Sequence, residues 1–208
     1  MPSRKIVTRV LLAIAVAALA AGAIAGCGAP KTVTRIDPNE TVDLSGRWND
    51  TDSRLVAEEM IADALGHPWL EKFTSSAGKS PTIIAGSIQN KSLEHIAVET
   101  FLKDIERAMV NSGSVQVVAS AEERGEVRDE REDQRVNASP ETLKRMGQEV
   151  GADFMLIGEI NQINDEEGGQ EVRYYQTDLS LVNIETNVKT WVGQKKIKKF
   201  VSHSEFSG

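Results

Sequence analysis

The only cysteine of the 208-residue chain, Cys27, follows an N-terminal segment typical of a secretory signal. Residues 1–9 contain three basic residues and no acid, and residues 10–26 contain only Ala, Leu, Ile, Val and Gly. A basic start followed by an apolar stretch is the layout of a signal peptide, which takes no part in the mature fold. With one cysteine, no disulfide can form within the chain. The folded domain must therefore be stabilised by packing alone.

The apolar stretch ends in Ile24-Ala25-Gly26-Cys27, which resembles the bacterial lipobox. We therefore predict cleavage before Cys27 and attachment of lipid to its sulfur. Two alternatives are an ordinary signal peptide with an incidental cysteine and an uncleaved transmembrane helix, for which roughly 20 apolar residues are needed. Gly28 after the cysteine, rather than Asp, is the pattern usually passed to the outer membrane in Gram-negative bacteria. We expect a lipid-anchored protein on the periplasmic face of that membrane.

The charge of the mature chain argues against nucleic acid as a partner. Without residues 1–26, 21 Lys and Arg remain against 31 Asp and Glu. An acidic domain is repelled by phosphate backbones and by anionic lipid headgroups. Residues 27–46 are polar and include two prolines, which indicates a flexible tether. Residues 47–208 are long enough for one globular domain with its own core, which we expect to be monomeric.

Hydrophobic spacing divides this domain into alternating helices and strands. We predict a helix over 54–65 capped by Asp52 or Ser53, then a loop containing Trp69 and Phe73. Further elements are predicted as a strand over 81–90, a helix over 92–113, a strand over 115–120, a short helix over 139–151, and strands over 152–163, 171–184 and 188–200. The segment 121–135, with 11 charged residues, is interpreted as a solvated helix or loop, with a partner-docking face as the alternative.

The order of these elements predicts an α/β sandwich with a mixed sheet that ends in an antiparallel three-strand meander. The segments 165–170 and 185–187 between the last three strands suit hairpin turns. The three histidines, His67, His95 and His203, lie far apart, and the chain has no HExxH motif and no second cysteine. We therefore expect no metal, no cofactor and no enzymatic activity.

The stretch SGRWNDTDSRLVAEEM, residues 45–60, has an order of residues that composition cannot explain. It resembles the LpoB family of bacterial lipoproteins, which activate class A penicillin-binding proteins. Further resemblance lies in 67–73, 90–96, 111–120, 151–160 and 186–199, so that it covers roughly residues 44–199. The tether here is shorter than the proline-rich linker of the enterobacterial members.

This resemblance implies a small domain similar to the N-terminal domain of TolB, tethered by lipid and bound to a peptidoglycan synthase. No catalysis is expected, because binding would favour an active state of the synthase. The alternatives are an envelope assembly or secretion lipoprotein related to the curli-secretion proteins and an envelope enzyme. The first would need long amphipathic strands that form a pore, and the second a clustered set of polar groups in a pocket.

The strand over 171–184 supplies candidate partner-binding residues. Alternation places Arg173, Tyr175 and Thr177 on one face and Tyr174, Gln176 and Asp178 on the other, one of which helices must cover. Tyr and Arg are frequent at interface hot spots. We therefore predict a docking patch that would attract an acidic partner. Its residues are Arg173, Tyr174, Tyr175, Lys195 and Lys196. The alternative is that one tyrosine is core and the lysines keep an edge strand soluble.

Overall fold

The computed structural model describes residues 31–139, 141 and 149–202. The chain divides into two units, residues 1–38 and 39–208. Within the first unit, residues 31–38 are exposed and contain no helix or strand. Cys27 and the predicted signal segment lie outside the described residues. All the helices and strands that the structure describes belong to the second unit.

The described part of the second unit contains four helices and five strands, with the five predicted strands present and two helices, α2 and α3, before the first of them. The helices are α2 (Asp50–Gly66), α3 (Pro68–Ala77), α4 (Val98–Ser112) and α5 (Ala121–Asn137). The strands are β1 (Thr82–Asn90), β2 (Gln116–Val118), β3 (Phe154–Glu167), β4 (Gln170–Asn183) and β5 (Lys189–Ser202).

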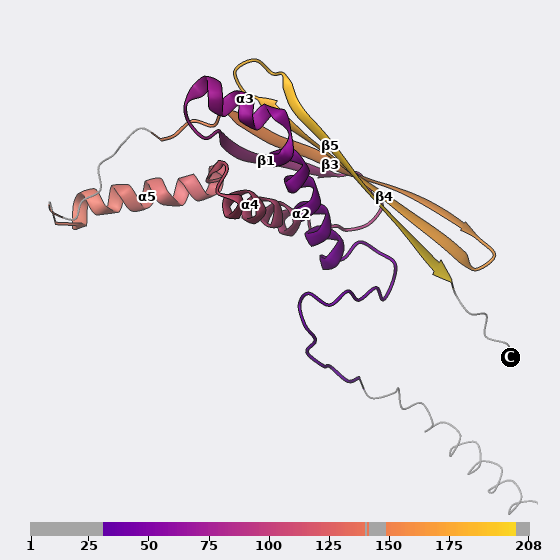
Figure 1. The fold of residues 1–208 in the computed structure, drawn as a ribbon. Coiled ribbons are helices and arrows are strands. Elements are labelled where there is room, and N and C mark those ends of the chain that lie inside the picture. Colours follow the sequence, from indigo (N-terminus) through magenta and orange to yellow (C-terminus); the bar gives the residue numbers. More distant parts are fainter. Residues whose placement is uncertain (1–30, 140, 142–148, 203–208) are drawn as a thin grey trace, which may run out of the picture. The chain divides into compact units, whose positions relative to one another are not determined.

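The five strands form one mixed sheet in the order β2-β1-β3-β4-β5. Strand β1 runs parallel to both β2 and β3, whereas β4 runs antiparallel to its two neighbours, β3 and β5. Figure 1 shows α2, α3 and α4 gathered on one face of this sheet, with the β3–β4 hairpin extending beyond them. The predicted α/β sandwich with a C-terminal antiparallel meander is therefore confirmed.

The hydrophobic core lies between these helices and the sheet. Helices α2 and α4 each turn a stripe of apolar residues, three or four positions apart, toward the strands. The strands contribute every second residue, because successive side chains point to opposite faces. Core members include Val56, Met60, Ile61, Phe101, Ile105, Met109, Leu156, Ile160, Leu179 and Leu181. Full burial of one such side chain stabilises the fold by roughly 1.5–3 kcal/mol.

A two-residue turn joins β3 to β4 and fixes their register. Gly168 and Gly169 have φ angles of 57° and 74°. Positive φ at both central positions defines the type I′ turn, whose twist matches that of a hairpin. The pairing is continuous from Glu167–Gln170 to Phe154–Asn183. This continuous register determines which face each residue of β4 occupies.

The predicted loop around Trp69 and Phe73 is instead helix α3. Pro68 occupies its first turn, and Gly78 ends it in the left-handed conformation. Trp69 and Phe73, four residues apart on one side of the helix, both contact the ring of Phe154 edge-on at 5.2 Å between centroids. The four-residue spacing of these two aromatic residues is a helical signal that the loop prediction overlooked.

Helix α4 begins at Val98, six residues later than predicted, so that His95 precedes it. Local hydrogen bonds hold the preceding segment out of the helix. The Asn90 side chain accepts from the Ser92 amide at 2.9 Å and donates to the Glu94 carbonyl at 2.7 Å. Asn and Ser side chains compete in this way with helix formation.

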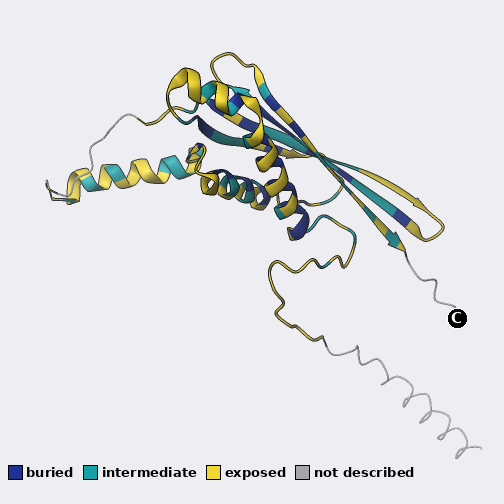
Figure 2. Ribbon diagram, viewed as in Figure 1, coloured by how far each residue is buried: buried dark blue, intermediate teal, exposed yellow. Residues whose placement is uncertain are grey.

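The charged segment 121–135 forms most of α5, which has no buried residue among those described (Figure 2). Ser120 and Glu123 form a reciprocal capping box at its start. The Lys103 ammonium, on α4, donates to Glu123 at 2.7 Å. Most of the short helix predicted over 139–151 lies outside the described residues, which omit 140 and 142–148.

Candidate partner-binding surface

Residues 42–49, here called the strap, lead into α2 and cap it. The helix begins after Asn49, whose side chain accepts from the Asp52 amide at 3.1 Å. The Asp52 carboxylate in turn accepts from the Asn49 amide at 2.9 Å. The predicted cap at Asp52 or Ser53 is therefore wrong: Asp52 completes a capping box that starts three residues earlier.

Trp48 fixes the strap against the body of the domain. Its Nε1 donates to Ser53 Oγ at 2.8 Å. Its ring meets Phe101 of α4 and Tyr175 of β4 edge-on, at centroid distances of 6.0 and 5.6 Å. Such contacts add roughly 0.5–1.5 kcal/mol beyond burial. The indole is partly buried rather than enclosed, which reduces the cost expected for its removal.

The Glu94 carboxylate joins the strap to the sheet. It accepts from the Trp48 amide at 3.2 Å, from Gln162 Nε2 at 2.8 Å and from the Tyr175 hydroxyl at 2.8 Å. Arg173 lies 3.6 Å away, and the Glu94 side chain is 13% exposed. Burial, followed by the hydrogen bond to Glu94, raises the pKa of Tyr175. No periodicity or motif in the sequence singled out Glu94 as the centre of this network.

A second polar cluster holds the strap against the end of β5. The Lys199 ammonium donates to Asp43 and to Asp52 at 2.6 Å each, and to the Arg47 carbonyl at 3.2 Å. Burial lowers the pKa of Lys199, but these two carboxylates outweigh it and leave the pKa raised. Burial is the main cause that raises the pKa of Asp52, although Lys199 opposes it.

Three of the five predicted docking residues point toward the helices. Tyr175 is fully buried and hydrogen-bonded to Glu94. Arg173 donates to Glu171 through Nε at 2.6 Å. Lys195, opposite Thr177 on this face, pairs with Glu59 of α2. The side chains of Arg173 and Tyr175 are thus largely enclosed, and Lys195 is ion-paired at a partly exposed position.

The other two, Tyr174 and Lys196, lie on the opposite face of the sheet, here called the open face. In β4 this face carries Val172, Tyr174, Gln176, Asp178, Ser180 and Val182. The rows across it are set by the pairings of Tyr174 with Ile163 and Lys198, and of Gln176 with Asn161 and Lys196. The structure thus splits the predicted patch between two faces of β4.

The open face combines a hydrogen-bonded polar centre with exposed apolar groups. The Tyr174 hydroxyl donates to Gln176 at 3.0 Å, and both Gln176 and Gln194 donate to Asp178 at 2.8 Å. Toward the end of the hairpin, Ile163 is 65% and Phe200 is 64% exposed. Fixed polar side chains beside exposed apolar ones match the make-up of protein interfaces.

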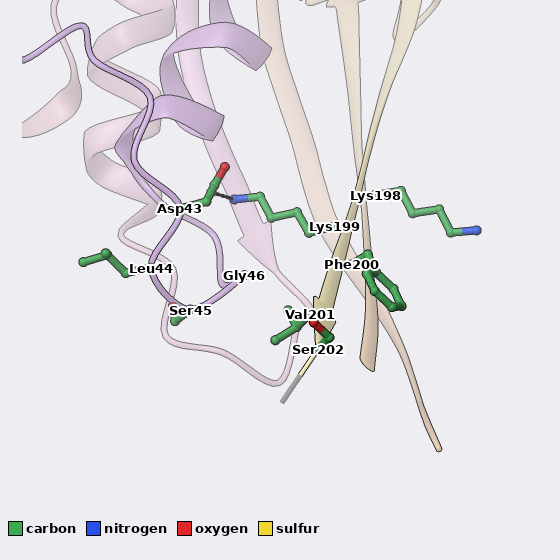
Figure 3. A pocket seen from close by; sticks show the side chains of 9 residues that line it. All are labelled: Asp43, Leu44, Ser45, Gly46, Lys198, Lys199, Phe200, Val201 and Ser202. Atoms are coloured by element: carbon green, nitrogen blue, oxygen red, sulfur yellow. Dashed lines mark hydrogen bonds and ion pairs between the residues drawn. The ribbon is translucent and has the colours of Figure 1, made fainter. Parts of the chain in front are cut away.

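The four lysines between positions 195 and 199 of β5 lie on opposite faces of the sheet. Lys195 and Lys199 face the helices and are ion-paired. Lys196 and Lys198 are exposed on the open face and form no ion pair within the part of the chain that the structure describes. Figure 3 shows the side chains of Lys199 and Lys198 on opposite sides of β5. Lys189, at the start of β5, is likewise exposed on this face without an ion pair among the described residues. The open face thus carries three such lysines, and it also carries the acidic residues Glu159 and Asp178.

A shallow hollow lies where the strap meets the end of β5 (Figure 3). Asp43, Leu44 and Ser45 form one side, and residues 198–202 form the other. Gly46 allows the close approach of the two, because its φ is +66° and an added Cβ would collide with Val201. Leu44 is 92% exposed beside this hollow.

The described residues contain no group of three His, Cys, Asp or Glu side chains placed to hold a metal ion. Among those same residues, no helix is both long enough and apolar enough to cross a membrane.

A comparison with protein families matches residues 52–197 to the family described as peptidoglycan-synthase activator LpoB. A search of curated proteins finds no match. Among solved structures, the C-terminal domain of LpoB from Salmonella enterica is 14% identical, with a TM-score of 0.40, over 71% of this chain and 99% of that one. The corresponding domain from Escherichia coli is 16% identical, with a TM-score of 0.41, over the same shares.

The lipoprotein GNA1162 from Neisseria meningitidis is 18% identical, with a TM-score of 0.39, over 61% of this chain and 88% of that one. Because all three TM-scores lie below 0.5, the assignment to a family rests on the sequence match over residues 52–197.

Proposed function

Because this chain belongs to the LpoB family of peptidoglycan-synthase activators, we propose that it binds and activates a class A penicillin-binding protein. The family match runs from the first turn of α2 to Ile197 in β5, and so overlaps every helix and strand of the described domain. We also propose that it acts without catalysing a reaction itself. Binding would raise the activity of the synthase by favouring its active state, and the effect would be limited by the difference in affinity for the two states.

The proposed docking surface is the open face near the end of the β3–β4 hairpin. Tyr174 and Lys196 remain from the sequence-based patch, and Lys198, Ile163 and Phe200 join them. The observation that supports this choice is that Lys196 and Lys198 form no ion pair among the described residues, while Lys195 and Lys199 are paired. Aromatic side chains beside unpaired cations would bind and steer an acidic partner surface.

We further propose that lipid on Cys27 holds the protein at the periplasmic face of the outer membrane. The support is the sequence Ile24-Ala25-Gly26-Cys27, with Gly28 after it. Stable anchoring requires more than one acyl chain, which a lipidated N-terminal cysteine provides. A Cys27→Ser variant should accumulate as an unprocessed precursor. Mass spectrometry of the wild-type protein from membrane fractions would contradict this if Cys27 proved unmodified.

Surface plasmon resonance against the purified synthase of the same cell tests the docking proposal. The full chain carrying Lys196→Glu and Lys198→Glu should bind at least tenfold more weakly, since two attractive contacts become repulsive. Each single variant should also bind more weakly, and the control matched to these in net charge is Lys72→Glu on α3, an exposed lysine whose charge reversal should leave the affinity unchanged. Wild-type affinity in the double variant would place the docking site elsewhere, and α5 would be the next surface to test.

A further inference from the structure

Strand β5 is the outer strand of the described sheet and is long. It has 14 residues, and β4 is its only strand neighbour among the described residues. In an edge strand, the backbone N–H and C=O groups on the outer side have no strand partner. Such an edge can pair with an extended segment of another chain, an interaction known as strand addition.

The hollow beside the strap borders this edge at its C-terminal end. Leu44 of the strap and Phe200 of β5 line it, and both side chains are largely exposed. In Figure 3 they lie on opposite sides of the β5 ribbon. A strand added next to residues 196–201 would therefore have an apolar side chain of this protein near each of its two faces.

The charges along the edge indicate what kind of strand would fit. On the open face, Lys196 and Lys198 would lie beside the side chains of an incoming strand, and each is free of an ion pair within the described residues. On the strap side, ion pairs with Asp43 and Asp52 neutralise the charge of Lys199. The surface next to it is formed by the apolar side chains of Leu44 and Val201. The edge thus presents two lysines and the exposed Phe200 on the open face, and apolar groups on the strap side.

A second copy of β5 would fit this edge poorly. Pairing two such strands would bring the Lys-rich segments together, and like charges on neighbouring strands are destabilising. Opposite charges in the same positions contribute roughly 0.2–1 kcal/mol for each pair. Charge complementarity therefore favours a strand from a different, acidic protein over self-association.

We propose that the outer edge of β5 accepts an extended acidic segment of a partner protein as a sixth strand. Acidic and apolar residues alternate along this segment. Its Asp or Glu side chains point toward Lys196 and Lys198, and its apolar side chains point toward Leu44 and Val201. This inference deepens the proposed function. It rests on that function only for the identity of the protein that supplies the acidic segment. The pairing itself is a property of the edge and can be measured without a synthase.

The test uses a synthetic eight-residue peptide that alternates glutamate and valine, added to the full chain in detergent. Amide hydrogen exchange followed by NMR should show at least tenfold slower exchange at alternate residues between 193 and 201, because those amides gain hydrogen bonds. Two control peptides should give no protection: one alternates lysine and valine, and the other has the glutamate-valine sequence with every backbone amide N-methylated, so that neither of its edges can donate. Equal protection by all three peptides, or none by any, would overturn the proposal.

A variant pair separates charge pairing from nonspecific attraction. Lys198→Glu should weaken binding of the glutamate-valine peptide at least tenfold, whereas Lys72→Glu, which changes net charge equally, should not. Equal weakening by both variants would overturn the proposal, because it would show attraction to net charge alone. If the peptide fails to bind but Lys196→Glu/Lys198→Glu still weakens binding of the synthase, strand addition is wrong and the open-face docking proposal stands.

Discussion

The two faces of β4 are formed by alternate residues of one 14-residue strand, yet their polar side chains are enclosed on one face and more exposed on the other. Toward the helices, Arg173 and Tyr175 are enclosed and bound to carboxylates from β4 and from the segment before α4. On the open face, Tyr174 and its polar neighbours hydrogen-bond to one another across exposed sheet surface. The difference shows that residue type alone does not identify a surface residue: the arginine and tyrosine on the covered face bind carboxylates of this chain, whereas the tyrosine on the open face is partly exposed.

The largest expected effect compares one glutamate from each side of the sheet. Glu94→Ala should lower the free energy of unfolding by about 3 kcal/mol, because it leaves the partly buried Arg173 and the Tyr175 hydroxyl without their carboxylate. Glu159→Ala should cost less than about 1 kcal/mol, since Glu159 forms an exposed pair with Lys91. Urea unfolding of both variants measures the difference. Equal costs would contradict the structural role assigned to Glu94.

A second comparison uses one aromatic residue from the strap, Trp48, and one from the open face, Phe200. Trp48→Ala should destabilise the domain by about 2 kcal/mol, less than a fully buried tryptophan would, because its indole is only partly buried. Phe200→Ala should change stability by less than about 0.5 kcal/mol, since that ring is exposed. Thermal unfolding and synthase binding should be measured together. If Trp48→Ala kept its stability but lost binding, the strap would belong to the docking surface.

A third prediction concerns Thr177 on the covered face. It is 1% exposed, and its hydroxyl has no hydrogen-bond partner within the described part of the chain. A buried, unpaired hydroxyl costs roughly 1–3 kcal/mol. Thr177→Val keeps the shape and removes this cost, so it should stabilise the domain by about 1 kcal/mol. Destabilisation measured in urea would show that the hydroxyl has a partner, such as a buried water.

The smallest expected effect is the response of the strap to acid. The hydrogen bond from Lys199 lowers the pKa of Asp43 below its usual 3.8. A folded-state pKa below the unfolded value gives stability that is present above pH 3.8 and is lost as the pH falls through the folded value. Asp52 acts in the opposite sense, because burial raises its pKa, so the net loss should be small.

Asp43→Asn should remove the Asp43 part of this acid sensitivity, whereas Glu40→Gln, at an exposed position just before the strap, should not. Urea unfolding at about pH 6 and about pH 3 would measure both. The same loss of stability in Asp43→Asn as in the wild type would contradict the pairing of Asp43 with Lys199.

The five strands, helices α2 and α4 and the alternation along β4 could be predicted because they follow from local spacing. The predicted meander, the turn around Gly168 and the separation of Tyr174 from Tyr175 are all present in the fold. The helical spacing of Trp69 and Phe73 was also visible in the sequence, but the flanking His67-Pro68 was interpreted as loop.

The location of the Glu94 network could not be predicted in the same way. Its members come from the strap, the segment before α4, β3 and β4, so only the assembled sheet brings them together. Sequence reasoning also treats arginine as a surface residue. The inward position of Arg173 depends on two carboxylates, Glu94 and Glu171, whose orientation no local pattern reveals.

Site-specific photo-crosslinking in intact cells tests the central claim most directly, namely that the open face binds the synthase. A photoreactive phenylalanine analogue would replace Tyr174 or Phe200 on the open face, and Leu55 or Lys72 on the exposed sides of α2 and α3. The account predicts crosslinks to a class A penicillin-binding protein from positions 174 and 200 and none from positions 55 and 72. Crosslinks from 55 or 72, with none from 174 or 200, would contradict it.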